Sequence, residues 1–290
     1  MRVLITGCNG QVGHCLTERL KNKADILAVD YEGLDITDQH AVIKTVYDFK
    51  PNYIINAAAH TAVDRAEEEI ELSNSINRDG PKYLAEAAQQ VNAVMLHIST
   101  DYVFDGEGDR PYSETDKTAP QGVYGQTKLA GESSVAQACD KHIVLRTAWV
   151  FGEHGNNFVK TMLRLAQTRD ELSIVGDQFG GPTYAGDIAD ALISIVEFIE
   201  KGRQPEWGIY HFSGMPYASW YDFAAKIFQL AEAKGVLAKQ PKISSIPTSA
   251  YPTPAKRPAN SRLNCGKIEN QFGIKPSDWN AAIENIQAYK

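Results

Sequence analysis

A glycine-rich segment directly after the first apolar run constrains the fold more than any other feature. Residues 7–13 read Gly-Cys-Asn-Gly-Gln-Val-Gly, between a predicted strand at residues 3–6 and a predicted helix at residues 11–21. Glycine allows a tight turn and close approach to a ligand, and the amino end of the next helix offers N–H groups to a pyrophosphate. The spacing is G-x-x-G-x-x-G, but its place between strand and helix favours dinucleotide binding over an ordinary turn. The predicted cofactor contacts are Gly7, Gly10, Gln11, Val12 and Gly13.

The first half of the chain alternates short β-branched apolar runs with longer segments of helical periodicity. The predicted strands, all expected to be buried on both faces, are residues 3–6, 26–29, 53–56, 94–99 and 143–147. Apolar positions three and four apart predict helices at residues 11–21, 40–49, 78–91 and 124–139. This alternation predicts an α/β fold with a doubly wound parallel, Rossmann-type sheet.

The pattern changes after residue 147. Helices are predicted at residues 158–165, 186–199, 219–234 and, as a last amphipathic helix, 278–289; a strand is predicted at 209–213, a glycine-rich stretch at 175–182 and a proline-rich connection at 241–258. We therefore predict an NAD(P)-binding domain over residues 1–150, joined by some elements from residues 170–212. A smaller α+β part over residues 151–290 is expected to bind mainly substrate. Without a clear linker, the two parts are expected to interleave and share a cleft.

Composition excludes several classes of function. Lys and Arg number 29 and Asp and Glu 36, a formal net charge of −7, so no basic field is available to hold a nucleic-acid backbone. No run approaches the roughly 20 apolar residues of a membrane span, and no secretory leader is seen, so we expect a cytoplasmic protein without a membrane partner. The four cysteines form no CxxC pair and no ligand-spaced cluster with the seven histidines. Free thiols and no metal site are therefore predicted.

Asp30, at the end of the second predicted strand, bears on the choice of cofactor. A carboxylate there accepts hydrogen bonds from the ribose hydroxyls of NAD but repels the 2′-phosphate of NADP. The next residues, Tyr31, Glu32 and Gly33, supply no cation to neutralise that phosphate. We expect NADH to be used at least as well as NADPH; the alternative is that Asp30 is an ordinary turn residue.

Three more side chains are candidates for chemistry. Tyr124 and Lys128 are spaced i, i+4 and share a helix face, so a phenol and an ammonium can stand beside one bound molecule. We expect the ammonium to lower the phenol pKa from about 10 toward neutrality, which makes it a usable proton donor or acceptor. Ser99 or Thr100, at the end of the fourth strand, can donate a hydrogen bond to a carbonyl oxygen, or can merely cap the chain after the strand. Tyr124, Lys128 and Thr100 are thus the predicted catalytic residues.

These motifs, in this order, resemble the extended short-chain dehydrogenase/reductase superfamily. More narrowly, residues 56–64, 99–104, 123–132, 146–152, 156–163, 177–183 and 257–263 are similar to the dTDP-4-dehydrorhamnose reductase family. The resemblance implies reduction of the 4-keto group of dTDP-4-dehydro-L-rhamnose to dTDP-L-rhamnose, with NADH or NADPH as cofactor. It implies that Tyr124 donates the proton, that Lys128 holds the nicotinamide ribose and that Thr100 orients the carbonyl.

The resemblance also implies further binding residues. The implied cofactor contacts are Asp35, Ile36, Ala57, Ala58, Ala59, His60 and Thr61. The implied contacts to the dTDP-sugar substrate are Thr100, Asp101, Trp149 and, for its diphosphate, Arg257. Some family members carry an acidic residue of a magnesium-bridged dimer where this chain has Cys15, so we do not predict that bridge. The oligomeric state is left open, with a homodimer as one alternative.

Two other functions are compatible with parts of the sequence. A nucleotide-sugar epimerase or dehydratase of the same superfamily would return the hydride, but the Glu and Lys usual in a dehydratase after the strand-end threonine are replaced by Asp101 and Tyr102. A non-catalytic regulatory protein, similar to the β subunit of methionine adenosyltransferase, can keep Tyr-x-x-x-Lys. Trp149 and residues 156–158 and 178–179 favour an enzyme, because they are expected to line a nucleotide-sugar pocket.

Overall fold

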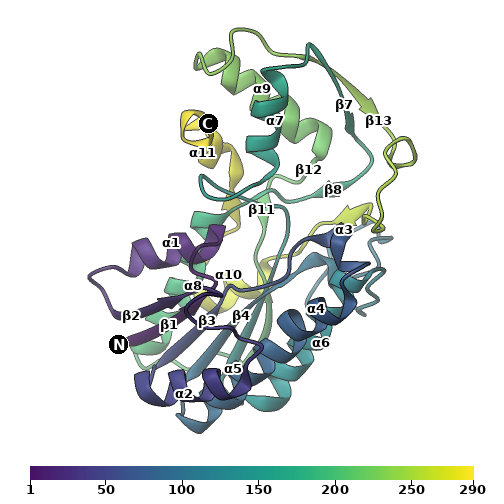
Figure 1. Ribbon diagram of the computed structural model, residues 1–290. Helices are drawn as coiled ribbons and strands as arrows, with labels where there is room; N and C mark the ends of the chain where they lie inside the picture. Colours follow the sequence, from purple (N-terminus) through teal and green to yellow (C-terminus); the bar gives the residue numbers. More distant parts are fainter.

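A computed structural model describes residues 1–290, and its main feature is one parallel sheet of six strands. The strands are β1 (Arg2–Thr6), β2 (Asp25–Val29), β3 (Tyr53–Asn56), β4 (Val94–Thr100), β5 (His142–Thr147) and β10 (Gly208–His211). Their order is β2-β1-β3-β4-β5-β10, with every pairing parallel (Figure 1). The predicted doubly wound sheet is confirmed. The order reverses between β1 and β3, and in such sheets ligands bind beyond the carboxyl ends of the strands at this switch point.

Helices cover both faces of this sheet. One face carries α1 (Gln11–Leu20) and α8 (Ala185–Glu200), and the other carries α2 (Gln39–Phe49), α5 (Gly80–Gln90) and α6 (Val123–Ala138) (Figure 1). Successive side chains of a strand point to opposite faces, and β1 supplies both cores in this way. Val3 and Ile5 pack beneath α1 and α8, whereas Leu4 packs beneath the other three helices. Two apolar cores therefore hold the strand ends in place.

Two predictions for the first half need correction. The expected burial of all five strands on both faces is wrong for β2, whose residues are only half-buried or exposed, because β2 is an edge strand. The helix predicted at residues 78–91 is part of a longer helical segment, in which α4 (Ile70–Asn74) and a π-helical turn (Ser75–Asp79) run into α5. The short helix α3 (Val63–Ala66) precedes them.

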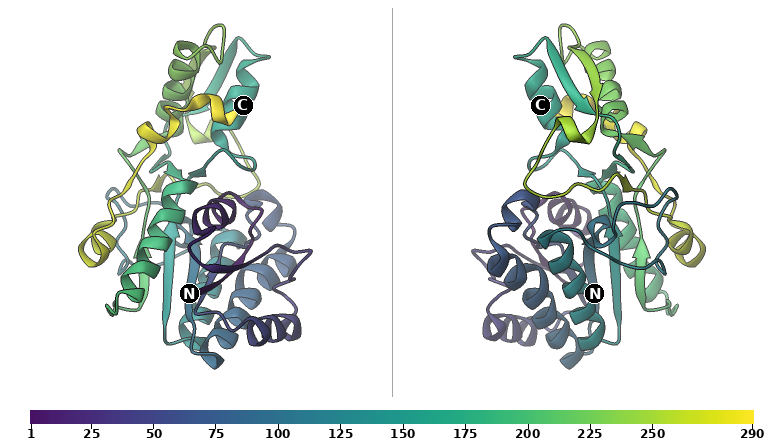
Figure 2. Two further views of the ribbon diagram at one scale, coloured as in Figure 1. Left: turned by 90° about the vertical axis from the view of Figure 1, so that its left-hand side faces the viewer. Right: turned by 90° about the vertical axis from the view of Figure 1, so that its right-hand side faces the viewer.

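Most of the C-terminal half forms a second lobe beyond the carboxyl edge of the sheet (Figure 2). It contains α7 (Phe158–Ala166), α9 (Trp220–Ala233) and α11 (Trp279–Ile283), packed around the buried rings of Phe151 and Phe223. Beside them, β7 (Glu171–Val175) pairs in parallel with β13 (Lys242–Ile246). Neither strand was predicted, and β13 lies within the segment expected to be only a proline-rich connection.

Short strand pairs join the lobes. They are β6 (Val150–Phe151) with β9 (Thr183–Tyr184), β11 (Gly214–Met215) with β15 (Ser277–Asp278), and β8 (Phe179–Gly180) with both β12 (Ala218–Ser219) and β14 (Asn260–Ser261). The remaining elements are α10 (Gly266–Phe272) and 3₁₀ turns at Asp101–Val103, Thr248–Ala250 and Ile286–Tyr289. The chain crosses between the lobes several times, and the domain boundary at residue 150 stays a prediction.

The predicted final helix over residues 278–289 is wrong in its length. Asp278 caps α11 by accepting a hydrogen bond from the Ala281 N–H at 3.2 Å, but α11 ends at Ile283. After Asn285 the chain resumes as a 3₁₀ turn, which places Ile286 and Tyr289 in the core of the C-terminal lobe. Tertiary packing therefore decides how this segment ends. None of the helices combines the length and the apolar composition that a membrane span requires.

Candidate active site

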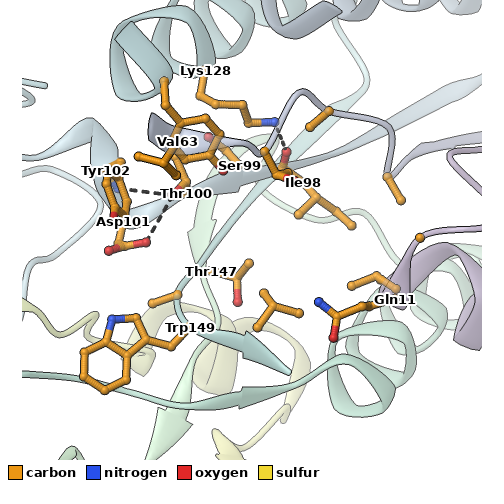
Figure 3. A pocket seen from close by; sticks show the side chains of 18 of the residues that line it. Gln11, Val63, Ile98, Ser99, Thr100, Asp101, Tyr102, Lys128, Thr147 and Trp149 are labelled. Carbon is orange, nitrogen blue, oxygen red and sulfur yellow. Dashed lines mark hydrogen bonds between the residues drawn. The ribbon is translucent and has the colours of Figure 1, made fainter. Parts of the chain in front are cut away.

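Two adjoining cavities open at the switch point of the sheet. The larger has a volume of about 540 Å³ and the smaller about 260 Å³. Gly10, Ala57 and Ala59 line both, so the two form one continuous cleft at the ends of β1 and β3. The larger cavity is bounded by the sheet lobe and by residues from the beginning of the C-terminal half, Trp149 (Figure 3) and Asn156.

The glycine loop fits a pyrophosphate at the centre of this cleft. Gly7 has a φ of +72°, and a Cβ there would stand 2.6 Å from the Ala58 nitrogen. Gly10 is the N-cap of α1 and provides no side-chain cap, so the amino end of the helix is open toward the cavities. Gly13 lines neither cavity; a Cβ at Gly13 would stand 2.0 Å from the Gly7 oxygen, so its role is close packing of α1 on the loop. The open helix end is the arrangement that binds anions.

The smaller cavity has the features expected of the adenosine end of a dinucleotide site. Asp30 lines it, and the two carboxylate oxygens accept hydrogen bonds from the N–H groups of Asn9 at 2.9 Å and Tyr31 at 2.7 Å. The other predicted contacts Asp35, Ile36, Ala57, Ala58 and Ala59 also line it. None of its lining residues is Lys or Arg.

The predicted catalytic residues converge in the larger cavity. Tyr124 and Lys128 reach it from α6, and Thr100 reaches it from the end of β4. A Cβ at Gly125 would stand 2.2 Å from the backbone carbonyl oxygen of Tyr102, so glycine lets α6 pack against the chain just after β4. This close approach places the Tyr124 phenol near Thr100.

The pKa values differ from the sequence prediction. Burial raises the pKa of the Tyr124 phenol; hydrogen bonding to Thr100 lowers this pKa by less, and the Asp101 carboxylate adds a still smaller increase. The expectation that Lys128 makes this phenol acidic is therefore wrong. The Lys128 ammonium instead donates to the Ile98 carbonyl at 2.6 Å, and burial lowers its pKa to about 8 (Figure 3). A phenol that stays protonated is the form that can give a proton to a developing alkoxide.

A buried ion pair stands one turn further along α6. Glu132 accepts hydrogen bonds from Arg146 Nε at 2.9 Å and Nη2 at 2.7 Å, and from the Ser99 hydroxyl at 2.5 Å. The Arg146 and Glu132 side chains are only 2% and 3% exposed. Because the Ser99 hydroxyl is engaged here, Thr100 is the strand-end hydroxyl that lines the cavity. Its Oγ1 donates to Asp101 Oδ1 at 3.1 Å and accepts from the Tyr102 N–H at 3.2 Å. The Glu132–Arg146 pair was not predicted, since its partners come from different elements.

The wall of the cavity toward the C-terminal lobe is Trp149. Its backbone has a φ of +49°, uncommon for a residue with a side chain, and its ring stacks on Trp220 with centroids 3.5 Å apart. A Cβ at Gly180 would stand 2.5 Å from the Trp149 ring, so the glycine-rich stretch makes room for it. The ring is thereby held as a flat surface in the cavity.

Besides Gly13, two predicted site residues do not line the cleft. The His60 ring lies between Ser73, at 2.8 Å, and Glu69, at 3.2 Å, and so packs against α4. Arg257 donates to the Asp64 carboxylate at 2.6 Å and to the Tyr102 hydroxyl at 3.1 Å, so it borders the larger cavity only through Tyr102. Thr61, Asp101, Gln11 and Val12 line the larger cavity as predicted.

Several lining residues were missed by the sequence analysis, among them Val63, Tyr102 and Thr147. Thr147 ends β5 just as Thr100 ends β4, so the rule that ligands bind at strand ends could have identified it. No group of three or more His, Cys, Asp and Glu side chains is placed to hold a metal ion, and the expected lack of a metal site stays a prediction.

Comparison with known proteins agrees with this geometry. The family model of the RmlD substrate binding domain matches residues 1–289. The dTDP-4-dehydrorhamnose reductase of Aggregatibacter actinomycetemcomitans is 53% identical over 290 residues, 99% of each chain. A crystal structure of a dTDP-4-dehydrorhamnose reductase from Clostridium acetobutylicum has a TM-score of 0.91 at 43% identity, covering 98% of each chain. The Bacillus anthracis enzyme, in complex with NADP, has a TM-score of 0.90 at 37% identity, covering 100% of this chain and 99% of that one. The chain therefore belongs to the RmlD family, with the dTDP-4-dehydrorhamnose reductases that it matches along its whole length.

Proposed function

We propose that the protein reduces the 4-keto group of dTDP-4-dehydro-L-rhamnose to a hydroxyl, giving dTDP-L-rhamnose, with NADH or NADPH as reductant. The observation that carries this proposal is the convergence of Tyr124, Lys128 and Thr100 in a cleft that also contains the open amino end of α1. Full-length similarity to proteins named for this reaction favours a reductase over an epimerase or a regulatory subunit.

The cleft residues divide the binding of the cofactor among them. When bound, the nicotinamide cofactor supplies a hydride. The glycine loop and the amino end of α1 would hold its pyrophosphate, and Asp30 would accept hydrogen bonds from the adenosine ribose. Lys128, anchored on the Ile98 carbonyl, has two further N–H groups for the nicotinamide ribose.

Tyr124 and Thr100 act on the substrate carbonyl. The Thr100 hydroxyl holds the carbonyl oxygen beside the phenol, and Tyr124 donates its proton to that oxygen as negative charge develops there. Trp149 provides a flat apolar surface for the sugar ring. Arg257, held by Asp64 at the edge of the cavity, donates a hydrogen bond to the Tyr102 hydroxyl. Its contact with the diphosphate, a homodimer and a cytoplasmic location stay predictions.

The decisive experiment follows NADH oxidation by the purified protein with a dTDP-4-keto sugar generated in the same reaction. We expect one NADH to be consumed for each dTDP-L-rhamnose formed. The sugar product should not be reduced further when more NADH is added. Interconversion of sugars with no net consumption of NADH would instead identify an epimerase. Cofactor binding with no turnover of any keto sugar would indicate a regulatory protein.

A further inference from the structure

Trp149 presents its indole to the larger cavity but is fixed by neighbours that lie outside it. Figure 3 shows this ring across the cavity from Lys128. Its backbone φ of +49° is uncommon for a residue with a side chain, so the surrounding structure must hold it in this conformation. The Thr183 N–H donates to the Trp149 carbonyl at 3.1 Å, which fixes the backbone. The orientation of the ring needs a separate support.

Trp220 provides that support. The two indole rings are nearly parallel, with centroids 3.5 Å apart and an interplanar angle of 9°. Trp220 lines neither cavity, so it can act on a ligand only through Trp149. The Phe158 ring of α7 also packs against Trp220, at a centroid distance of 4.6 Å. Trp149 is therefore the cavity-facing member of an aromatic cluster, and packing within the cluster favours one plane for its ring.

The indole of Trp220 is itself fixed at both ends. Trp220 begins α9, and the capping box of Ser219 and Asp222 holds this helix start, with N–H···O distances of 3.0 Å in both directions. At the far end of the side chain, Trp220 Nε1 donates to Gln178 Oε1 at 3.2 Å. The Gln178 amide is oriented in turn by the Thr248 hydroxyl, which accepts from Nε2 at 3.1 Å. The Trp220 ring therefore has little freedom to turn.

One strand pair brings these parts together. β8 and β12 are antiparallel, with Gly180 opposite Ala218. Gln178 directly precedes β8, and Trp220 directly follows β12, so the pairing places the amide beside the indole. From the sequence, Gln178 was expected to line the nucleotide-sugar pocket, but it is only 6% exposed and lines neither cavity. Its contact with Trp220 gives it a supporting place behind Trp149.

We propose that Trp220 is a positioning residue for substrate binding: by stacking on Trp149, it holds that indole in the plane that binds the sugar ring. This inference rests on the proposed function, in which Trp149 provides the surface for the sugar. When only a fraction of the molecules has the binding orientation, the apparent affinity falls by that fraction. Loss of the stack should therefore weaken sugar binding without slowing the chemical step, because Tyr124 and Lys128 belong to α6.

The kinetic test compares Trp220→Leu, which removes the aromatic ring, with Trp220→Phe, which keeps one. If about one molecule in ten then holds Trp149 in place, Trp220→Leu should raise the KM for the keto sugar about tenfold, with kcat within about twofold and the KM for NADH unchanged. Trp220→Phe should stay within about threefold of wild type, because a phenyl ring still stacks. Trp207→Leu, at a half-buried tryptophan packed against the sheet core, is the matched control and should keep all three values.

A double-mutant cycle tests whether Trp220 acts through Trp149. Calorimetric titration with dTDP-L-rhamnose measures sugar binding, and dTDP alone, which lacks the sugar ring, is the control ligand. In a Trp149→Leu background, Trp220→Leu should have no further effect on dTDP-L-rhamnose binding, because the ring that it positions is gone. An equal loss with and without Trp149 would overturn the proposal. A similar loss of dTDP binding, or an unchanged KM for the keto sugar in Trp220→Leu, would also overturn it.

A measurement without ligand keeps this inference separate from the proposed function. Incorporation of fluorotryptophan gives one fluorine NMR resonance for each of the four tryptophans, assigned by single substitutions. In Trp220→Leu the Trp149 resonance should broaden as the ring exchanges between orientations, whereas the Trp207 resonance should keep its width. A Trp149 resonance as sharp as in wild type would overturn the positioning role, whatever the activity. If wild type does not reduce the keto sugar, the proposed function fails, and a broadened resonance would still show that Trp220 positions Trp149.

Discussion

The ends of β4 and β5 carry two sets of polar side chains: one set is paired with a buried carboxylate, and the other faces the cleft. Ser99 and Arg146 are in register and face α6, where Glu132 pairs with both. Thr100 and Thr147, each one residue later and also in register, face the cleft, where the Thr147 hydroxyl has no partner. Because successive side chains of a strand alternate between faces, two neighbouring strands produce one paired set and one open set. The paired set holds the helix that carries Tyr124, and the open set, Thr100 and Thr147, lines the cleft.

The largest expected effect on the cleft side is that of Tyr124→Phe. This change removes the proton donor and leaves the ring, so turnover should fall about 10²- to 10⁴-fold. NADH affinity, measured by fluorescence titration, should be nearly unchanged because the phenol is not proposed to hold the pyrophosphate. Tyr47→Phe, at an exposed tyrosine of α2, is the control and should keep full turnover. Wild-type turnover in Tyr124→Phe would remove this residue from the mechanism.

On the paired side, Glu132→Gln should mainly change stability. It leaves the buried Arg146 guanidinium without a counter-charge, and the free energy of unfolding should fall by about 3–5 kcal/mol in urea titration. Glu171→Gln breaks the exposed ion pair with Lys242 and should change stability little. The double change Glu132→Leu with Arg146→Met removes both charges and should recover part of the loss. Equal stability of Glu132→Gln and wild type would contradict the division between the two sets.

Apart from Thr147, the residues of the cleft were easier to predict from the sequence than the Glu132–Arg146 pair. Tyr124, Lys128 and the glycine loop lie in short contiguous motifs whose spacing has a local meaning, and the strand ends are read from apolar runs. The Glu132–Arg146 pair joins a helix to a strand, and the pairing of β7 with β13 joins Glu171 to Lys242, so neither has a local signal.

Spacing also leaves the direction of a side chain undetermined. His60 and Arg257 were expected at the ligand because their segments match the family, but each side chain is engaged by neighbouring carboxylates. The i, i+4 spacing placed Tyr124 and Lys128 on one face but did not reveal that the ammonium reaches the Ile98 carbonyl. Burial has the largest effect on the pKa of Tyr124, and the burial of a side chain can be determined only from the folded structure.

Asp101, the residue after Thr100, makes the stability of the folded chain depend on pH. Burial raises its pKa from 3.8 to about 6, so the folded state binds this proton more tightly than the unfolded state. Its contribution to stability is therefore full at low pH and declines as the pH rises from about 4 to 6, by roughly 3 kcal/mol for a shift of about two units. In Asp101→Asn this decline should be absent, so the stability of the variant relative to wild type should increase over that range. Urea titrations at pH 4 and pH 7 measure the difference, and a constant difference would show that Asp101 does not titrate in this way.

Asp30 is an intermediate case, because it lines the cleft and yet both of its oxygens are paired with backbone N–H groups. With its orientation held and no cation in the small cavity, its charge should disfavour the 2′-phosphate of NADPH, so kcat/KM for NADH should at least equal that for NADPH. Asp30→Asn keeps the size of the side chain and removes the charge. A repulsion of about 1 kcal/mol in water predicts a rise of about fivefold in kcat/KM for NADPH, with a smaller change for NADH. A wild-type enzyme that prefers NADPH by about a hundredfold would contradict this prediction. It would show that the Asp30 carboxylate only stabilises the conformation of the loop and does not select between the two cofactors.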